Sequence, residues 1–309
     1  MTLNFRQIRA FVAVYEEGSF NRAARRENAT QSGLSMQIAN LEAEIGLRVF
    51  ERSAKGVVPT QTGERLYRRA TAILRAISET ESELALLAGE ISGRIHVGLV
   101  PAFTYSLLAP ALSDFIERYK SVDVTISEAY SPALSEVVAR GEFDFAIVPA
   151  GPERSGIRSD HFGSDSELLV SGRRSPLTHL KAVRLAALPP LKLVLPTHGN
   201  ARRERLEAYF AANGVEIVAI LEMDAMLATL EFVAETDWMT IVPSIVVNGD
   251  ITGEARKLHP IVVPHATVDY AVIAAGGRAL SASARRFLET LRSQFEVQRA
   301  KLDAALLEA

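Results

Sequence analysis

A short polar segment near the N-terminus, TQSGLSM at residues 30–36, carries side chains that can bind the edges of nucleic-acid bases. Glutamine can pair bidentately with adenine, serine can bond several bases, and methionine can pack against a thymine methyl group. A basic turn at residues 52–56, RSAKG, suits phosphates or a minor groove. Serine or threonine at a helix start leaves backbone N–H groups where they favour phosphate. The predicted DNA-contacting residues are Ser19, Thr30, Gln31, Ser32, Ser35, Met36, Arg52 and Lys55.

The same features also have a purely structural explanation. A polar face on a small helical bundle is commonly just solvated, and Ser or Thr at a helix start is commonly only a cap. Periodicity alone therefore leaves DNA binding and a solvated surface as open alternatives.

A second group of residues follows the ends of predicted strands later in the chain. Open parallel sheets bind ligands beyond the carboxyl ends of their strands, and helices that start there can hold an anion on their N–H groups. His198, with Arg202 or Arg203 just behind it, adds positive charge, so we expect a small anionic or carboxylated effector. The predicted effector-binding residues are Ala102, Phe103, Thr104, Ser131, Pro149, Thr197, His198 and Asn200.

Simpler alternatives exist for this group as well. Ser131, Thr197 and Asn200 are also ordinary turn and cap residues. His198 suits an exposed loop, and Phe103 can either line a pocket or cover the core.

Catalytic chemistry has little support in the sequence. The chain has no cysteine, which removes disulfides, thiolate nucleophiles and cysteine-based zinc sites. The Gly-x-Ser-x-Gly, Walker and His-Glu-x-x-His motifs are missing, and none of the six histidines has metal-ligand spacing with a carboxylate. We therefore expect no catalytic residue, no metal and no cofactor.

Three short helices must position the base-reading segment. The first has an apolar face over residues 5–15 and ends at Gly18. Ser19 caps a second helix, and Thr30 caps a third that ends at Gly46.

A candidate hairpin follows the third helix, with strands at residues 48–51 and 57–58. Three helices and a hairpin predict a winged helix-turn-helix over residues 1–60. In this motif the second helix of the pair enters the major groove and presents its N-terminal residues to the bases.

Residues 61–91 predict a long helix with a heptad seam. Apolar side chains recur at alternating spacings of four and three, a pattern that needs a partner helix. The alternative is one long amphipathic helix packed on its own domain. We favour pairing between subunits, because a Ser-Gly break follows and no neighbouring helix lies nearby in the sequence. The predicted dimerisation residues are Leu66, Ala70, Ile73, Ile77, Thr80, Leu84 and Leu87.

From residue 92 onward the pattern changes to strands alternating with helices, and the order strand–helix–strand–helix–strand occurs twice. Two such units predict mostly parallel sheets in a two-lobed α/β domain over residues 92–309. We expect one lobe at 92–162 and 262–309 and the other at 163–261, with the effector bound between them.

No basic stretch at the N-terminus leads into a long apolar run, and no segment approaches about 18 consecutive apolar residues. We therefore expect a cytoplasmic protein without a secretory signal or a membrane partner. The net charge of −3 argues against a generally basic DNA-coating protein.

The stretch GSFNRAARRENATQSGLSMQIANLEAEIGLRVFER, followed by PTQTGE, resembles the N-terminal signature of the LysR-type transcriptional regulators. The matching positions are Ser19, Phe20, Ala23, Ala24, Gln31, Ser32, Leu34, Ser35, Ile38, Leu41, Glu42, Gly46, Phe50, Glu51, Arg52, Thr60 and Gly63. The order of the later regions also agrees, as a linker helix followed by a two-lobed domain like the periplasmic binding proteins.

The resemblance implies a regulator that binds double-stranded promoter DNA as a homodimer or homotetramer and responds to a small-molecule effector. The chain departs from the family at Ser32 and Gly33, where a proline is usual at one position, and at Met36, where arginine is common. Loss of that arginine removes a base or phosphate contact, so the operator sequence cannot be taken from a relative. The remaining alternative is a two-lobed solute-binding protein, which needs export and would not carry the N-terminal helices.

Overall fold

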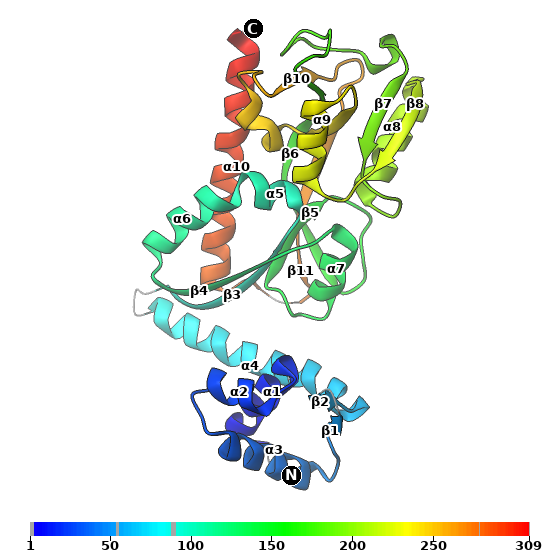
Figure 1. Ribbon diagram of the computed structural model, residues 1–309. Coiled ribbons are helices and arrows are strands. Elements are labelled where there is room, and N and C mark those ends of the chain that lie inside the picture. Colours follow the sequence, from blue (N-terminus) through cyan, green and yellow to red (C-terminus); the bar gives the residue numbers. More distant parts are fainter. Residues whose placement is uncertain (1–2, 54–55, 88–90, 278, 309) are drawn as a thin grey trace. The chain divides into compact units, whose positions relative to one another are not determined.

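The computed structural model describes residues 3–53, 56–87, 91–277 and 279–308. The chain divides into two compact units, Met1–Gly93 and Arg94–Ala309 (Figure 1). Each unit is described by itself below. Within the described residues, no helix combines the length and the apolar character needed to span a membrane.

The first unit contains helices and one two-stranded hairpin, in which β1 and β2 pair antiparallel. Its elements are α1 (Phe5–Glu17), α2 (Phe20–Arg26), α3 (Gln31–Ile45), β1 (Phe50–Ser53), β2 (Gly56–Pro59) and α4 (Gln61–Leu87). The predicted boundaries of the helices are confirmed, because Ser19 and Thr30 are the N-caps of α2 and α3. Gly18 and Gly46 end α1 and α3 with φ of 58° and 70°, a conformation that favours glycine.

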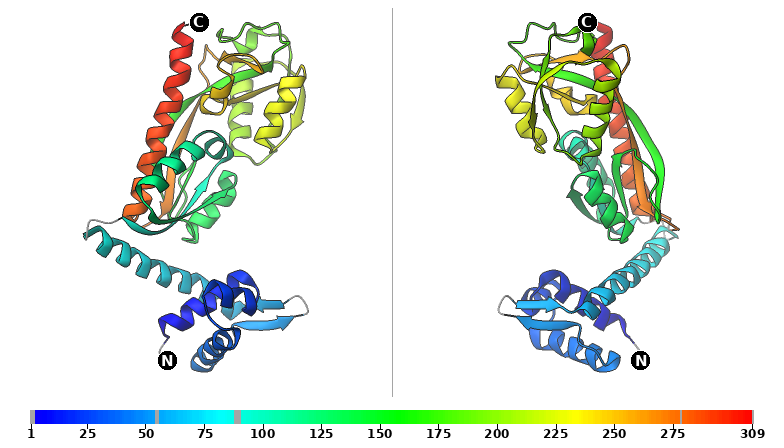
Figure 2. Two further views of the ribbon diagram at one scale, coloured as in Figure 1. Left: turned by 60° about the vertical axis from the view of Figure 1, so that its left-hand side comes forward. Right: turned by 90° about the vertical axis from the view of Figure 1, so that its right-hand side faces the viewer.

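The core of the first unit includes the beginning of α4. Phe11 of α1 is fully buried and packs against Phe50 of β1 with ring centroids 5.2 Å apart. Tyr67 of α4 stacks on Tyr15 of α1 at 3.9 Å, and Ala70 is only 1% exposed. The first turns of α4 therefore belong to the bundle from which the rest of the helix projects (Figure 2).

This packing divides the predicted dimerisation seam into two parts. Leu66 and Ala70 contact the core of their own unit, as the alternative of self-packing requires. Ile73 and Leu84 are 42% and 62% exposed. Thr80 is exposed and Ile77 is half-buried, whereas the side chain of Leu87 lies outside the described residues. Among the seam side chains that the structure describes, Ile73, Thr80 and Leu84 are thus exposed to a second helix.

The second unit is an α/β structure with nine strands among its described residues. The strands are β3 (Ser92–Leu99), β4 (Ser121–Glu128), β5 (Phe145–Pro149), β6 (Ile157–Gly172), β7 (Leu191–Leu195), β8 (Ile217–Glu222), β9 (Met239–Pro243), β10 (Arg256–Pro260) and β11 (Thr267–Ala275). The helices are α5 (Pro101–Ser106), α6 (Leu108–Arg118), α7 (Ser131–Ala139), α8 (Ala201–Asn213), α9 (Met226–Glu235) and α10 (Ala282–Glu308), with short 3-10 helices at Leu185–Ala187 and Ser244–Asp250.

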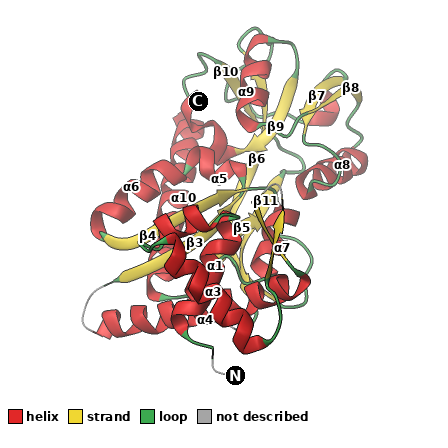
Figure 3. Ribbon diagram, turned by 60° about the horizontal axis from the view of Figure 1, so that its bottom comes forward, coloured by secondary structure: helices red, strands yellow, loops and turns green. Residues whose placement is uncertain are grey.

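The long strand β6 joins the two lobes of this unit (Figure 3). Its residues 157–166 pair with β11, in the order β4-β3-β5-β11-β6, and its residues from Glu167 onward pair with β9, in the order β6-β9-β7-β8. The change of partner falls close to the expected lobe boundary at residue 162.

The predicted parallel pairing holds for β3 with β5 and for β7 with β8 and β9. Strands β6, β10 and β11 pair antiparallel, so each lobe contains a mixed sheet rather than a mostly parallel one. The sequence did not predict β6, because the first half of that strand, IRSDHFGS, lacks a regular apolar alternation.

An aromatic cluster fastens α10 to the first lobe. Phe103 of α5 stacks on Phe295 of α10 with centroids 5.8 Å apart, and Phe162 and Tyr270 meet these rings edge-on. All four side chains are at most 2% exposed. Phe103 therefore covers the core, which was one of the two alternatives for it.

Candidate functional site

The N-terminal end of α3 presents polar side chains to solvent. Thr30 accepts a hydrogen bond from the Gly33 N–H at 3.1 Å, which fixes the first turn. Gln31 and Ser32 are exposed there, and Met36 is 59% exposed one turn later. Leu34, Ile38 and Leu41 are buried on the other side of the helix. The buried side thus holds α3 so that its polar start faces outward.

A depression in the surface brings two of the predicted DNA-contacting residues together. Ser19 at the start of α2 and Gln31 at the start of α3 both line it. Its remaining lining residues are Gly18, Phe20, Asn21, Arg22 and Val57. The backbone N–H of Val57 donates to the Gly18 carbonyl at 3.3 Å, which joins the hairpin to this surface. Arg22 was not predicted, and nothing in its spacing distinguishes it from the other arginines of α2.

Several arginines of the first unit are paired with carboxylates of the same unit. Arg9 lies 2.7 Å from Glu27, and Arg26 lies 2.6 Å from Glu16. These pairs reduce the charge available to phosphate. Of the two predicted basic contacts on the hairpin, Arg52 lies in β1 and Lys55 is outside the described residues.

Glu42 on α3 fixes the position of the hairpin. One of its carboxylate oxygens accepts hydrogen bonds from the N–H groups of Val49 and Phe50, at 2.8 and 3.3 Å. Gly63 completes the junction, because a Cβ atom there would lie 2.2 Å from the Val49 carbonyl oxygen. Both residues match the sequence signature for a structural reason rather than as contacts to DNA.

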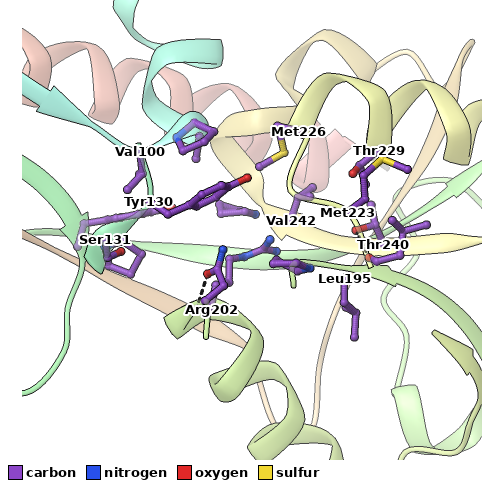
Figure 4. Close-up of a pocket in the computed structure, with 18 residues that line it drawn as sticks. Val100, Tyr130, Ser131, Leu195, Arg202, Met223, Met226, Thr229, Thr240 and Val242 are labelled. Carbon is purple, nitrogen blue, oxygen red and sulfur yellow. Dashed lines mark hydrogen bonds between the residues drawn. The ribbon is translucent and has the colours of Figure 1, made fainter. Parts of the chain in front are cut away.

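The second unit contains a cavity between its two lobes (Figure 4). The free volume inside it is about 50 Å³, and together with the open solvent at its mouth the empty space is about 630 Å³. The lining residues are Val100, Pro101, Ala102, Tyr130, Ser131, Pro149, Val194, Leu195, Pro196, Asn200, Arg202, Met223, Met226, Thr229, Thr240, Val242, Pro243 and Tyr270. Residues that follow strands β3, β4, β7 and β8 are among them, as expected for a ligand site at the carboxyl ends of strands.

The predicted effector-binding residues divide into two groups. Four of them line the cavity: Ala102, Ser131, Pro149 and Asn200. Four others are not among its lining residues: Phe103, Thr104, Thr197 and His198.

The side chains that do not reach the cavity have other partners. The hydroxyl of Thr104 donates to Glu128, and the hydroxyl of Thr197 donates to Asp224. His198 is 72% exposed and lies 3.2 Å from Glu222. These residues therefore stabilise the loops around the cavity.

Arg202 is the single charged residue among the residues that line the cavity. Its Nε and Nη2 atoms donate to the two carboxylate oxygens of Glu167 at 3.2 and 3.0 Å, and Nη2 also donates to the Ile241 carbonyl. The two side chains are 11% and 3% exposed. Burial lowers the pKa of Arg202, but the charge and hydrogen bonds of Glu167 outweigh it and raise that pKa overall.

The other cations of the expected anion site also have partners. The buried guanidinium of Arg203 donates to the Pro196 carbonyl at 3.0 Å and to Glu207 at 2.7 Å. His198 lies beside Glu222. The three side chains expected to supply positive charge, His198, Arg202 and Arg203, therefore each have a carboxylate partner. These cations thus add less free positive charge than expected, whereas α7 and α8 do begin beside the cavity, as the anion expectation requires.

Two buried acidic groups near the cavity have raised pKa values. Burial, followed by the charges of Asp224 and Glu128, raises the pKa of Tyr130 to about 12. Burial raises the pKa of Asp165 to about 6, although its carboxylate accepts hydrogen bonds from the Ser244 hydroxyl and the Ile245 N–H. Burial is the first cause for both groups, so their surroundings favour the uncharged forms of these two side chains.

The predicted effector-binding residues did not include the apolar and hydroxyl side chains of the second lobe, although the loop at 222–224 was expected at the cleft. Met223, Met226 and Thr229 come from the loop before α9 and from α9 itself, and Thr240 comes from β9. The hydroxyl of Thr240 donates to the Val194 carbonyl at 2.8 Å. Such residues look like ordinary core in the sequence. In the part of the chain that the structure describes, no cluster of His, Cys, Asp or Glu is arranged to hold a metal ion.

A helix-turn-helix with an exposed polar helix start, followed by a two-lobed domain with a cavity for a small molecule, defines a ligand-responsive DNA-binding transcription regulator. The description "Bacterial regulatory helix-turn-helix protein, lysR family" matches residues 5–64, and "LysR substrate binding domain" matches residues 88–296. The chain belongs to the LysR family of transcriptional regulators.

Relatives of known name agree with this assignment along most of the chain. The chain is 28% identical to the transcriptional regulator GbpR of Azospirillum brasilense, over 94% of this chain and 86% of that protein. It is 30% identical to PgrR of Escherichia coli, over 73% of this chain and 75% of that protein. These relatives are DNA-binding regulators and not solute-binding proteins without a DNA role.

Solved structures share the fold over nearly the whole length. A full-length OxyR variant from Pseudomonas aeruginosa matches with a TM-score of 0.72 at 20% identity, over 96% of each chain. Full-length CbnR in complex with its target DNA matches with a TM-score of 0.63 at 22% identity, over 94% of this chain and all of that one.

Proposed function

We propose that this regulator recognises an operator through the start of α3 and responds to a small molecule bound in the cavity of its second unit. The exposed polar start of α3 carries this proposal. Gln31 and Ser32 stand at the end of a helix whose other side is buried, which suits insertion of that end into the major groove. CbnR, which shares the fold, is known in complex with its target DNA.

Specificity would come from Gln31, Ser32, Ser35 and Met36, and orientation from contacts to phosphate. Ser19 lies in the same depression as Gln31, so the starts of α2 and α3 can meet one DNA backbone and the adjoining bases together. Arg52 and Lys55 are proposed as phosphate contacts of the hairpin.

We further propose that the regulator acts as a homodimer or homotetramer. The exposed part of the α4 seam, with Ile73 and Leu84 on it, would pair with the same helix of a second copy. Two copies would place two recognition helices on two half-sites of the operator. The protein would act in the cytoplasm and without catalysis, as DNA-binding regulators do.

The test is a gel shift of the full chain with DNA from upstream of its own gene. We expect a shifted band with the parent chain and a much weaker one with Gln31→Ala, while binding to unrelated DNA is the same for both. Footprinting that gives the same protected site and the same affinity for both chains would remove Gln31 from the proposed interface.

A further inference from the structure

The charges around the cavity identify the kind of small molecule that it accepts. This inference rests on the proposed function, since it concerns the effector of the same cavity. Among the described residues that line the cavity, Arg202 is the only charged one, and Glu167 pairs with it through two hydrogen bonds, with side chains 11% and 3% exposed. A bound carboxylate would have to compete with Glu167 for the same guanidinium.

One end of the Arg202 guanidinium is still available. Nε and Nη2 are used by Glu167 and Ile241, whereas Nη1 has no hydrogen-bond partner among the described residues. The side chain points into the middle of the cavity (Figure 4). An N–H group of an ion pair without net charge is a donor for a neutral oxygen acceptor, such as a carbonyl or an amide.

Two exposed carboxylates act on a residue that lines the cavity. Glu128 and Asp224 are exposed, and both act electrostatically on the hydroxyl of the lining residue Tyr130. Glu128 is held by Thr104 and Asp224 by Thr197, so the two carboxylates have fixed positions. An anion beside Tyr130 would meet the negative charge of these two carboxylates.

Most of the remaining lining is apolar and comes from both lobes. Pro101 and Pro149 belong to the first lobe, and Met223, Met226 and Val242 belong to the second. Methionine adapts to ligands of irregular shape. Hydroxyl groups at Tyr130 and Thr229 have no hydrogen-bond partner among the described residues, so they can orient a ligand through one or two polar atoms.

We propose that the effector of this regulator is an uncharged, largely apolar small molecule with an oxygen acceptor that bonds to Arg202, and not a carboxylate. A cation in the cavity would lie against the guanidinium of Arg202, and an anion would have to compete with Glu167 for that guanidinium. The neutral amide of an aromatic acid therefore fits better than the acid itself.

The test uses three probes of nearly equal shape, 2-naphthamide, 2-naphthoate and 2-naphthamidine, with the full chain. Ligand-detected NMR and calorimetry measure binding, accompanied by a screen of small neutral compounds and carboxylates. We expect neutral compounds to be the hits and the amide to bind at least tenfold more tightly than either charged analogue. Carboxylate hits, or a charged probe that binds as tightly as the amide, would overturn the inference while leaving the cavity as a ligand site.

Binding must also depend on the cavity. Met226 lines the cavity, while its neighbour Leu227 on α9 does not and is 58% exposed. Met226→Trp should abolish binding, and the matched control Leu227→Trp should leave it unchanged. Absence of any hit, or equal binding by both variants, would contradict the proposed effector site itself and the inference with it.

The ion pair supplies a direct test of the charge argument. Glu167→Gln removes the carboxylate and leaves the positive charge of Arg202, so we expect affinity for 2-naphthoate to rise at least tenfold. The double variant Glu167→Gln with Arg202→Gln removes both charges and the proposed donor, so the gain in carboxylate affinity should be absent and affinity for 2-naphthamide should fall. If Glu167→Gln does not increase binding of the carboxylate, Glu167 is not what excludes anions. If that variant fails to fold, an unchanged amide affinity in the double variant would overturn the bond to Arg202.

Discussion

Helices α3 and α8 both have polar side chains at their starts, but those of α3 are exposed to solvent and that of Arg202 in α8 is largely buried. At α3 the residues after the cap, Gln31 and Ser32, are exposed to solvent. At α8 the residue after the first helical position, Arg202, is buried against Glu167. The polar side chains at the start of α3 are thus free to contact a partner such as DNA. At the start of α8, Arg202 already forms hydrogen bonds within the protein.

This difference explains why one helix start suits a polymer and the other a small molecule. Phosphate and base contacts gain affinity because side chains and backbone N–H groups are free to replace water. In the cavity the strong electrostatic partners are already bonded to each other, so a ligand is left with apolar contacts and a few weak polar ones. The predictions below test this contrast, in order of expected effect.

The largest effect is expected from breaking the buried pair. Arg202→Met leaves the Glu167 carboxylate buried without its partner, which typically costs about 3–5 kcal/mol. We expect urea unfolding of the second unit to show a loss of that order. Removing the exposed Arg118, which lies 2.8 Å from Asp114, should change stability by less than about 1 kcal/mol. Equal losses in the two variants would show that Arg202 and Glu167 are not a buried pair in solution.

The second effect concerns the buried carboxyl group of Asp165 on β6. Its folded-state pKa of about 6 lies above the ordinary value of 3.8, so between these pH values the folded protein binds more protons than the unfolded chain. The stability that protonated Asp165 contributes to the folded state is fully present below about pH 4. It is lost as the pH rises through 6, which lowers the free energy of unfolding by about 3 kcal/mol in all. Free energies of unfolding should show it as a decrease with rising pH that Asp165→Asn removes.

The matched control for this experiment is Asp160→Asn on the same strand, whose side chain is 58% exposed. It should retain the pH dependence of the parent. A parent chain whose stability relative to Asp165→Asn is the same at pH 4 and pH 7 would contradict the raised pKa.

The two sites were not equally predictable from the sequence. The position of α3 could be predicted from local sequence alone. Thr30 is its N-cap, Gln31 its first residue and Gly46 its C-cap, all within one short segment. The cavity is not local: Tyr130 and Arg202 are far apart in the chain and meet only because β6 joins two lobes. The loops could be placed at strand ends from topology, but no spacing predicts that Glu167 pairs with Arg202.

The same distinction explains the misplaced residues. Phe103 and Thr197 follow strands as an effector contact should, yet one enters an aromatic cluster and the other bonds to Asp224. A loop position fixes where the backbone is, and the rotamer and neighbours decide where the side chain goes. Likewise the heptad pattern of α4 does not reveal that Ala70 is buried in its own bundle.

The third prediction tests the exposed side of the comparison. Gln31→Ala should reduce affinity for the operator by about ten- to hundredfold, since one bidentate contact is worth roughly 1–3 kcal/mol of discrimination. Fluorescence anisotropy with operator and scrambled duplexes measures this directly, and affinity for the scrambled duplex should not change. Asn40→Ala is the control, because Asn40 is also exposed on α3 but lies far from its N-terminal end. A similar loss on both duplexes would mean that Gln31 contacts backbone rather than bases.

The smallest effect is expected from Thr30, where structure and recognition meet. Its hydroxyl accepts from the Gly33 N–H, and loss of such a cap typically costs about 1 kcal/mol. Thr30→Ala should therefore lower the stability of the first unit by about that amount, while Thr30→Ser, which keeps the hydroxyl, should not. Because the cap also holds Gln31 at the end of an ordered turn, we expect operator affinity to fall in Thr30→Ala and to be retained in Thr30→Ser. Reduced stability with unchanged operator affinity would separate the cap from recognition, and the ordered start of α3 would then not be what DNA reads.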